Sequence, residues 1–171
     1  MARPDHLDHV DRVVAQWAAE RPDVDASPIR VIGRLSRLTR TVERRLQDVF
    51  DRHGIEAWEY DVLAALRRSG APFELTAGDL LTALMITSGA VTNRIDRMEA
   101  RGLVRRIRDE VDRRVVRVRL TDAGYDLVER ALPDHLDNER AILEPLTEAD
   151  VRRLERLLRG LQAGLDADRP A

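Results

Sequence analysis

Residues 88–120 read SGAVTNRIDRMEARGLVRRIRDEVDRRVVRVRL, and the hydrophobic period changes part-way along this stretch. Three apolar residues first repeat at helical spacing: Val91, Ile95 and Met98. Gly102 follows them as a residue that typically ends a helix. Residues 103–107 and 115–120 are strand-like, with an apolar and polar alternation in the second, and residues 108–114 form a polar tip between them. The stretch therefore predicts a helix followed by a two-stranded β-hairpin.

A second, shorter helix is expected just before this one. Thr76-Ala-Gly-Asp79 resembles a capping box in which aspartate replaces the usual glutamate, and it opens a helix that reaches Leu84. A short turn at residues 86–87 leads to the helix that begins at Ser88. Two helices joined by so short a turn are typical of a helix-turn-helix.

Amphipathic helices are expected on both sides of this core. Their predicted ranges are 5–20, 28–54 and 56–69 before it and two helices within 121–167 after it. Thr121 and Thr147 cap the last two, and Pro133 is expected to kink or interrupt the first of these. We therefore predict a mainly α fold, a winged helix-turn-helix with a two-stranded β-wing between helical arms. The arms carry more apolar surface than so small a core can cover, which favours a two-fold dimer.

Composition excludes several classes of protein. The 171 residues are 43% apolar and 35% charged, which is typical of a mostly helical globular chain. The absence of cysteine excludes disulfide scaffolds, thiolate metal sites and cysteine nucleophiles. All 29 basic residues are arginine, so lysine-dependent chemistry is excluded as well. The first residues carry no apolar signal segment and no apolar run could span a bilayer, so we expect a cytoplasmic protein without membrane contact.

The net charge of −2 hides a strong local asymmetry. Residues 94–119 hold ten arginines against five acids, a net charge of +5, whereas residues 121–150 hold nine acids against two arginines, a net charge of −7. A basic stretch of this kind within a slightly acidic chain indicates a local site for a polyanion.

The predicted second helix has the residues needed to read DNA. Opposite its apolar stripe lie small and hydrogen-bonding side chains, which suit a helix placed in a major groove. The expected DNA contacts are Thr76, Ser88, Gly89, Thr92, Asn93 and Arg97, with Asp112, Arg113 and Arg114 at the hairpin tip. An arginine at the tip suits a narrow minor groove, and a neighbouring aspartate can orient it.

The motifs of this stretch resemble those of the MarR-type (multiple antibiotic resistance regulator) transcription factors. The resemblance rests on Thr87 to Glu99, Arg101-Gly-Leu-Val-Arg-Arg106, Asp112-Arg-Arg114 and Val118 to Gly124, and it covers roughly residues 30–165. It implies a homodimer that binds double-stranded, pseudo-palindromic operator DNA, usually as a repressor released by a small acidic or phenolic ligand. Arg114 would be the arginine that enters the minor groove, and Asp112 would orient it. Glu110 departs from the pattern, because many members have proline there.

The resemblance also implies a domain plan. We expect one MarR-like domain over residues 1–171, with an extra N-terminal helix at 5–20, dimerisation helices at 28–54 and 121–167, and the winged helix-turn-helix at 56–120.

Four further residues resemble the ligand site of the urate-responsive branch of that family. Arg94 lies beside the apolar stripe and needs a charged partner, for which Asp61 is a candidate. The branch adds Trp17, on the extra helix, and Arg106, on the first wing strand. The implied effector is a small anion such as urate, which bonds Trp17 and Arg106 and disturbs the Asp61–Arg94 pair. No cofactor is implied.

Alternative functions remain open from the sequence. The effector could be another aromatic or organic acid, or the protein could be a ligand-independent DNA-binding protein. A protein-interaction module would leave the basic hairpin unexplained. An enzyme is disfavoured, because the four histidines are scattered and no nucleophile and base are paired. His6-x-x-His9 is a weak metal motif for which a solvated helix end is the preferred interpretation, so no metal site is predicted.

Overall fold

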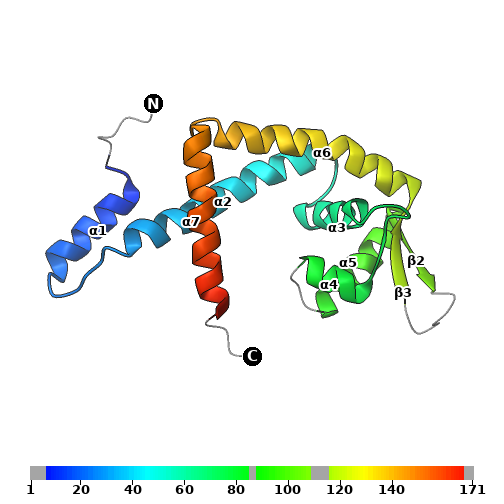
Figure 1. The fold of residues 1–171 in the computed structure, drawn as a ribbon, viewed down its shortest axis with the longest axis horizontal. Coiled ribbons are helices and arrows are strands. Elements are labelled where there is room, and N and C mark those ends of the chain that lie inside the picture. Colours follow the sequence, from blue (N-terminus) through cyan, green and yellow to red (C-terminus); the bar gives the residue numbers. More distant parts are fainter. Residues whose placement is uncertain (1–6, 85–87, 109–115, 168–171) are drawn as a thin grey trace. The chain divides into compact units, whose positions relative to one another are not determined.

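The computed structural model describes residues 7–84, 88–108 and 116–167, and this part of the chain is mainly helical with one small sheet (Figure 1). In chain order the elements are α1 (His9–Glu20), α2 (Ile29–Arg52), α3 (Ala57–Arg68), β1 (Glu74–Thr76), α4 (Ala77–Leu84), α5 (Ser88–Ala100), β2 (Val104–Arg108), β3 (Val116–Leu120), α6 (Asp122–Leu143) and α7 (Glu148–Ala167). The described residues form two compact units, one within residues 1–42 and 139–171 and the other within residues 43–138, called the winged unit below. None of the described helices is long and apolar enough to cross a membrane.

Local capping explains where the helices of the winged unit begin and end. Thr76 caps α4 as predicted, because its Oγ1 accepts the Asp79 backbone N–H at 3.1 Å and its own hydroxyl donates to the Asp79 carboxylate at 2.7 Å. The Thr121 hydroxyl likewise accepts the backbone N–H of Gly124 at 3.1 Å at the start of α6. Gly102 follows α5 with a φ of +69°, the left-handed conformation expected of a helix-ending glycine.

Within the described residues the sheet has three strands, one more than the predicted hairpin. The strand order is β1-β3-β2, and both pairings are antiparallel. The hairpin of β2 and β3, which is the predicted two-stranded wing, is confirmed, and β1 adds a third strand to its sheet. β1 spans only Glu74–Thr76, too short a segment for its period to be recognised in the sequence. It forms because Glu74 lies opposite Arg119 in the register and accepts a 2.7 Å hydrogen bond from the Arg119 Nε.

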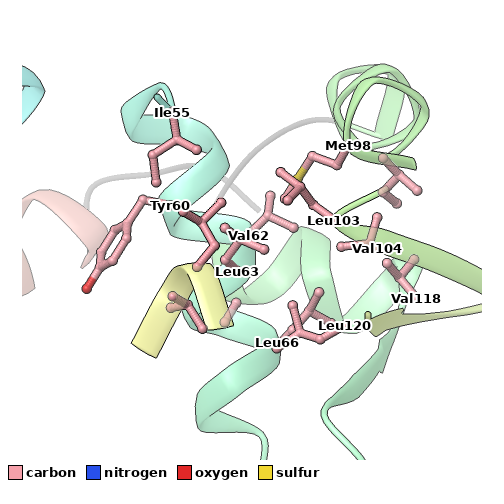
Figure 2. Close-up of a cluster of buried hydrophobic side chains, with 14 of the residues drawn as sticks. Ile55, Tyr60, Val62, Leu63, Leu66, Met98, Leu103, Val104, Val118 and Leu120 are labelled. Atoms are coloured by element: carbon pink, nitrogen blue, oxygen red, sulfur yellow. The ribbon is translucent and has the colours of Figure 1, made fainter. Parts of the chain in front are cut away.

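The core of the winged unit joins α3, the helix-turn-helix and the base of the wing. α4 packs on α3 and α5, and α5 packs on β2 (Figure 1). The predicted stripe Val91, Ile95 and Met98 is buried, which confirms it. Figure 2 shows part of this cluster, in which side chains from α3 and the loop before it meet those from the end of α5, the loop after it and the sheet: Ile55, Tyr60, Val62, Leu63, Leu66, Met98, Leu103, Val104, Val118 and Leu120. Because this face of α5 is buried in the core, the opposite face of the helix is exposed to solvent.

α6 continues through Pro133, so the helix is not interrupted there as the sequence had allowed. Leu127, Val128 and Ala131, in the preceding turns, are buried in the core of the winged unit. Burial of this apolar face holds the helix in place despite the one backbone hydrogen bond that proline removes.

In the other unit, α1 packs against α2 and α7 presents an uncovered apolar side. Asp8 caps α1, and Val10 lies so close to α2 that a Cβ on Gly33 would be 3.3 Å from it. Arg34 binds Asp8 at 2.9 Å and Asp11 at 2.8 Å. Leu7 precedes the helix and is exposed. Four leucines of α7 are exposed in the single chain: Leu157, Leu158, Leu161 and Leu165.

Candidate nucleic-acid interface

The outward face of α5 carries small and hydrogen-bonding side chains, as expected. Gly89, Thr92 and Asn93 are all exposed and lie opposite the buried stripe. Apart from its chain neighbours and the backbone of its own helix, no described atom lies within 4 Å of the place where a Cβ on Gly89 would be, so the described part of the chain leaves room for close approach there. Ser88 is the first residue of the helix. This face can accept a surface that offers hydrogen-bonding edges, such as a DNA groove.

Arg97, an expected DNA contact, extends along the flank of α5 that faces α3. Its guanidinium binds the Glu56 carboxylate at 2.7 Å and lies 4.6 Å from the centroid of the Trp58 ring. The Trp58 indole N–H also donates to Glu56, at 2.6 Å. This indole bond, followed by the Arg97 bond, lowers the pKa of Glu56, so the carboxylate stays charged and holds the arginine.

Arg94 lies on the same flank and turns toward the protein, as predicted. Its guanidinium is 5.4 Å from the Trp58 centroid, so Trp58 contacts both arginines. Among the described residues, Arg94 and Asp61 do not form an ion pair within 4 Å, but their charges still interact at longer range. Loss of hydration raises the pKa of Asp61, and the positive charge of Arg94 opposes that rise, followed by those of Arg68 and His135.

A third arginine of this flank makes an ion pair with a buried glutamate that the sequence did not predict. Arg101 donates from Nη1 to both Glu59 oxygens at 2.6 Å and from Nη2 to the Gly54 carbonyl at 2.8 Å. Glu59 is only 1% exposed. The spacing of Arg94, Arg97 and Arg101 by three and four residues was a signal of a single charged flank. Its partner Glu59 could not be recognised, because it lies 42 residues earlier.

Arg106 reaches from the strand β2 to the helix α5. Its Nη2 binds Asp96 at 2.5 Å, its Nη1 binds Glu99 at 2.5 Å, and its backbone N–H donates to Glu99 at 2.9 Å. The backbone bond, together with the guanidinium, lowers the pKa of Glu99, so this carboxylate stays charged. Asp96 and Glu99 had no assigned role in the sequence analysis.

The remaining predicted residues are placed as follows. Thr76 is the cap of α4, at the start of the helix-turn-helix. Trp17 lies on α1, the extra N-terminal helix, and is 49% exposed. Asp112, Arg113 and Arg114 lie outside the described residues, as does Glu110. Among the residues that are described, no cluster of three histidines or acids could hold a metal ion.

Comparison with known proteins identifies this arrangement. A model of the MarR family matches residues 53–115. The chain is 44% identical over 149 residues to the HTH-type transcriptional regulator PecS of Dickeya dadantii (strain 3937), a match that covers 87% of this chain and 90% of that protein. The chain belongs to the MarR family. α4 and α5 are thus the helix-turn-helix of a MarR-family protein, and β2 and β3 form its wing.

Solved structures of DNA-binding proteins agree with this assignment. A MarR mutant from E. coli complexed with operator DNA matches with a TM-score of 0.69 at 26% identity, covering 85% of this chain and 96% of that one. A structure of Bordetella bronchiseptica BpsR, a protein whose DNA binding is regulated by 6-hydroxynicotinic acid, matches with a TM-score of 0.69 at 29% identity, covering 77% and 92% of the two chains. The chain is therefore a DNA-binding transcriptional regulator and not an enzyme.

Proposed function

We propose that this MarR-family regulator is a homodimeric repressor that leaves its operator when a small anionic aromatic ligand such as urate binds. The observation that carries the proposal is that both proposed ligand arginines are tied to α5, the helix that we expect to read DNA (the recognition helix). Arg94 belongs to α5 itself, and Arg106 is bound to two carboxylates of α5. An anion that draws either guanidinium toward itself therefore acts directly on the helix that reads DNA.

Asp61 supplies the sensitivity to a negative ligand. Its carboxylate is already disfavoured by lost hydration, and the nearby charge of Arg94 offsets part of that cost. A ligand anion that competes for Arg94 withdraws this compensation and adds repulsion. A coupling of about 1–3 kcal/mol would weaken operator binding by about 5–150-fold. Trp17, which is half exposed on α1, is the fourth proposed ligand residue.

The class of ligand is supported by the comparison with BpsR. That protein responds to 6-hydroxynicotinic acid, which, like urate, is a flat, acidic heteroaromatic molecule. Such a molecule suits a set of residues with two arginines and an indole, because guanidinium groups bind carboxylate-like edges and stack on rings. Other aromatic acids are therefore the second candidate ligands.

For the DNA complex we propose contacts from α4, α5 and the wing tip. Asn93 suits a bidentate contact with adenine, and Gly89 allows the backbone to approach closely. Arg114 is the proposed minor-groove arginine, oriented by Asp112. Ser88, Thr92, Arg97, Arg113 and Thr76 complete the proposed set.

The homodimer is proposed from the uncovered apolar side of α7. Leu157, Leu158, Leu161 and Leu165 recur at helical spacing and are exposed in the single chain. A contiguous apolar stripe of this kind is typical of a subunit interface. A dimer would present two recognition helices, which matches a pseudo-palindromic operator.

Fluorescence anisotropy on a duplex from upstream of the protein's own gene tests the proposal, beside a scrambled duplex at the same salt concentration. We expect specific binding that is lost on adding urate, and a weaker urate response in the Asp61→Asn variant. Specific binding lost with 6-hydroxynicotinic acid but not with urate would assign the other ligand class. Binding that responds to neither and depends only on salt would refute the ligand response and leave a ligand-independent DNA-binding protein.

A further inference from the structure

Arg106 joins the wing to the recognition helix through three contacts. The guanidinium binds Asp96 and Glu99, each at 2.5 Å, and the backbone N–H donates to Glu99 at 2.9 Å. β2 is an edge strand, because the strand order is β1-β3-β2. The Glu99 carboxylate therefore covers part of the strand edge that β3 does not pair with.

Asp96 lies on the same outward side of α5 as the predicted base-reading residues. It comes three residues after Asn93 and four after Thr92, the spacing that places helical side chains on one side. Its side chain is 59% exposed even with Arg106 bound to it. A carboxylate at this position would face the phosphates of a duplex docked on α5.

Two carboxylates on a DNA-reading helix are unfavourable for binding a polyanion, because like charges repel at short range. Arg106 places its single positive charge between them, so the group of three carries a net charge of −1 instead of −2. The fixed geometry also holds the first strand of the wing at a defined position against α5.

We infer that Arg106 is a positioning residue for DNA binding, which masks Asp96 and Glu99 from the DNA and fixes the wing on the recognition helix. It acts through the two carboxylates and not by a phosphate contact of its own. The inference depends only on the DNA-binding function of the MarR-family fold and is independent of urate.

A mutant cycle distinguishes an Arg106 that masks the two carboxylates from an Arg106 that contacts DNA directly. Arg106→Ala should weaken binding to the duplex from upstream of the protein's own gene on the order of tenfold at low salt, because it uncovers two charges. Asp96→Asn combined with Glu99→Gln should bind at least as tightly as the wild type. Adding Arg106→Ala to that double variant should then cost less than about twofold, since no charge remains to be masked.

The matched control is Arg105→Ala. Arg105 is the neighbouring exposed arginine of β2, and the described part of the chain offers it no ion-pair partner. Its loss should weaken binding equally with and without Asp96→Asn and Glu99→Gln. Circular dichroism of each variant reports whether it is folded, and Arg106→Gln replaces the alanine variant if the latter unfolds.

The outcomes of the cycle are distinct. If Arg106→Ala weakens binding by the same factor in both backgrounds, Arg106 contacts DNA directly and the inference is wrong. If the double variant binds more weakly than the wild type, the carboxylates assist binding and the inference is also wrong. Neither result bears on the urate response, which is measured separately.

Discussion

Replacing Arg101 with methionine should destabilise the winged unit far more than the loss of an ordinary surface arginine. The Arg101 guanidinium donates to both oxygens of Glu59 at 2.6 Å, and Glu59 is only 1% exposed. In the variant the carboxylate would keep the backbone N–H of Glu56, at 2.9 Å, as its donor among the described residues. The Gly54 carbonyl would lose its 2.8 Å bond as well.

The magnitude follows from how deeply each partner is buried. Removing one partner of a fully buried ion pair costs about 3–5 kcal/mol, because the other charge is left without compensation. The Arg101 side chain is 43% exposed, so water can reach part of the vacated space. We therefore expect a loss of about 2–3 kcal/mol in the free energy of unfolding. For a chain of this length that corresponds to about 4–12 °C in Tm.

Urea unfolding followed by circular dichroism at fixed protein concentration measures this loss. The matched control is Arg152→Met. Arg152 also pairs with a glutamate, Glu148 at 3.3 Å, but both side chains are exposed at 62% and 90%. Its loss should leave the unfolding midpoint unchanged, because exposed pairs of this spacing contribute little.

A second variant tests the physical cause. Combining Arg101→Met with Glu59→Met removes both charges and should recover most of the stability, because no buried carboxylate remains uncompensated. The reasoning is refuted if Arg101→Met unfolds at the wild-type urea concentration. It is also refuted if the double variant is as unstable as the single one, since the loss would then come from packing.

Three further predictions follow from the contacts. Gly124→Ala should strongly destabilise the protein, because the added Cβ would lie 2.0 Å from the Leu103 carbonyl oxygen. Gly160→Ala places its Cβ where no neighbouring side chain lies within 4 Å, so it should stabilise α7 by about 0.5–1 kcal/mol. Equal Tm values for the two variants would contradict this prediction. Thr76→Ala removes the cap of α4 and should lower the free energy of unfolding by about 1 kcal/mol in urea, where an unchanged midpoint would show that the cap is dispensable. Because folding raises the pKa of Asp61, the protonated carboxyl group stabilises the folded state in acid, and this stabilisation is lost as the pH rises through the pKa that Asp61 has in the folded protein. Asp61→Asn should therefore have a higher Tm than the wild type near neutral pH, a difference that closes in acid; a difference that widens in acid would refute the sign of the shift.

The elements of the fold were predictable because their signals are local. Each signal depends only on residues a few positions away along the chain: the apolar stripe of Val91, Ile95 and Met98, the helix cap at Thr76, and the helix-ending Gly102. The strand β1 was missed, since three residues carry no recognisable period and pair with β3 only after the chain has folded.

The candidate site was only partly accessible from the sequence. The exposed residues Gly89, Thr92 and Asn93 follow from helical periodicity, and the inward turn of Arg94 follows from the same geometry. Helical periodicity says on which side of a helix a charge lies, but not which charge it meets across space.

The amino-acid sequence by itself determined the helix-turn-helix, its wing and the basic character of this region. Only the tertiary structure decided the partners of the arginines: Glu56 for Arg97, Glu59 for Arg101, and Asp96 with Glu99 for Arg106. The physical reason is range. Capping and periodicity are set by neighbours along the chain. The pairs of Arg97 and Arg101 instead join residues about forty positions apart, and the pairs of Arg106 join a strand to a helix. All of them form only when packing of the core brings these elements together.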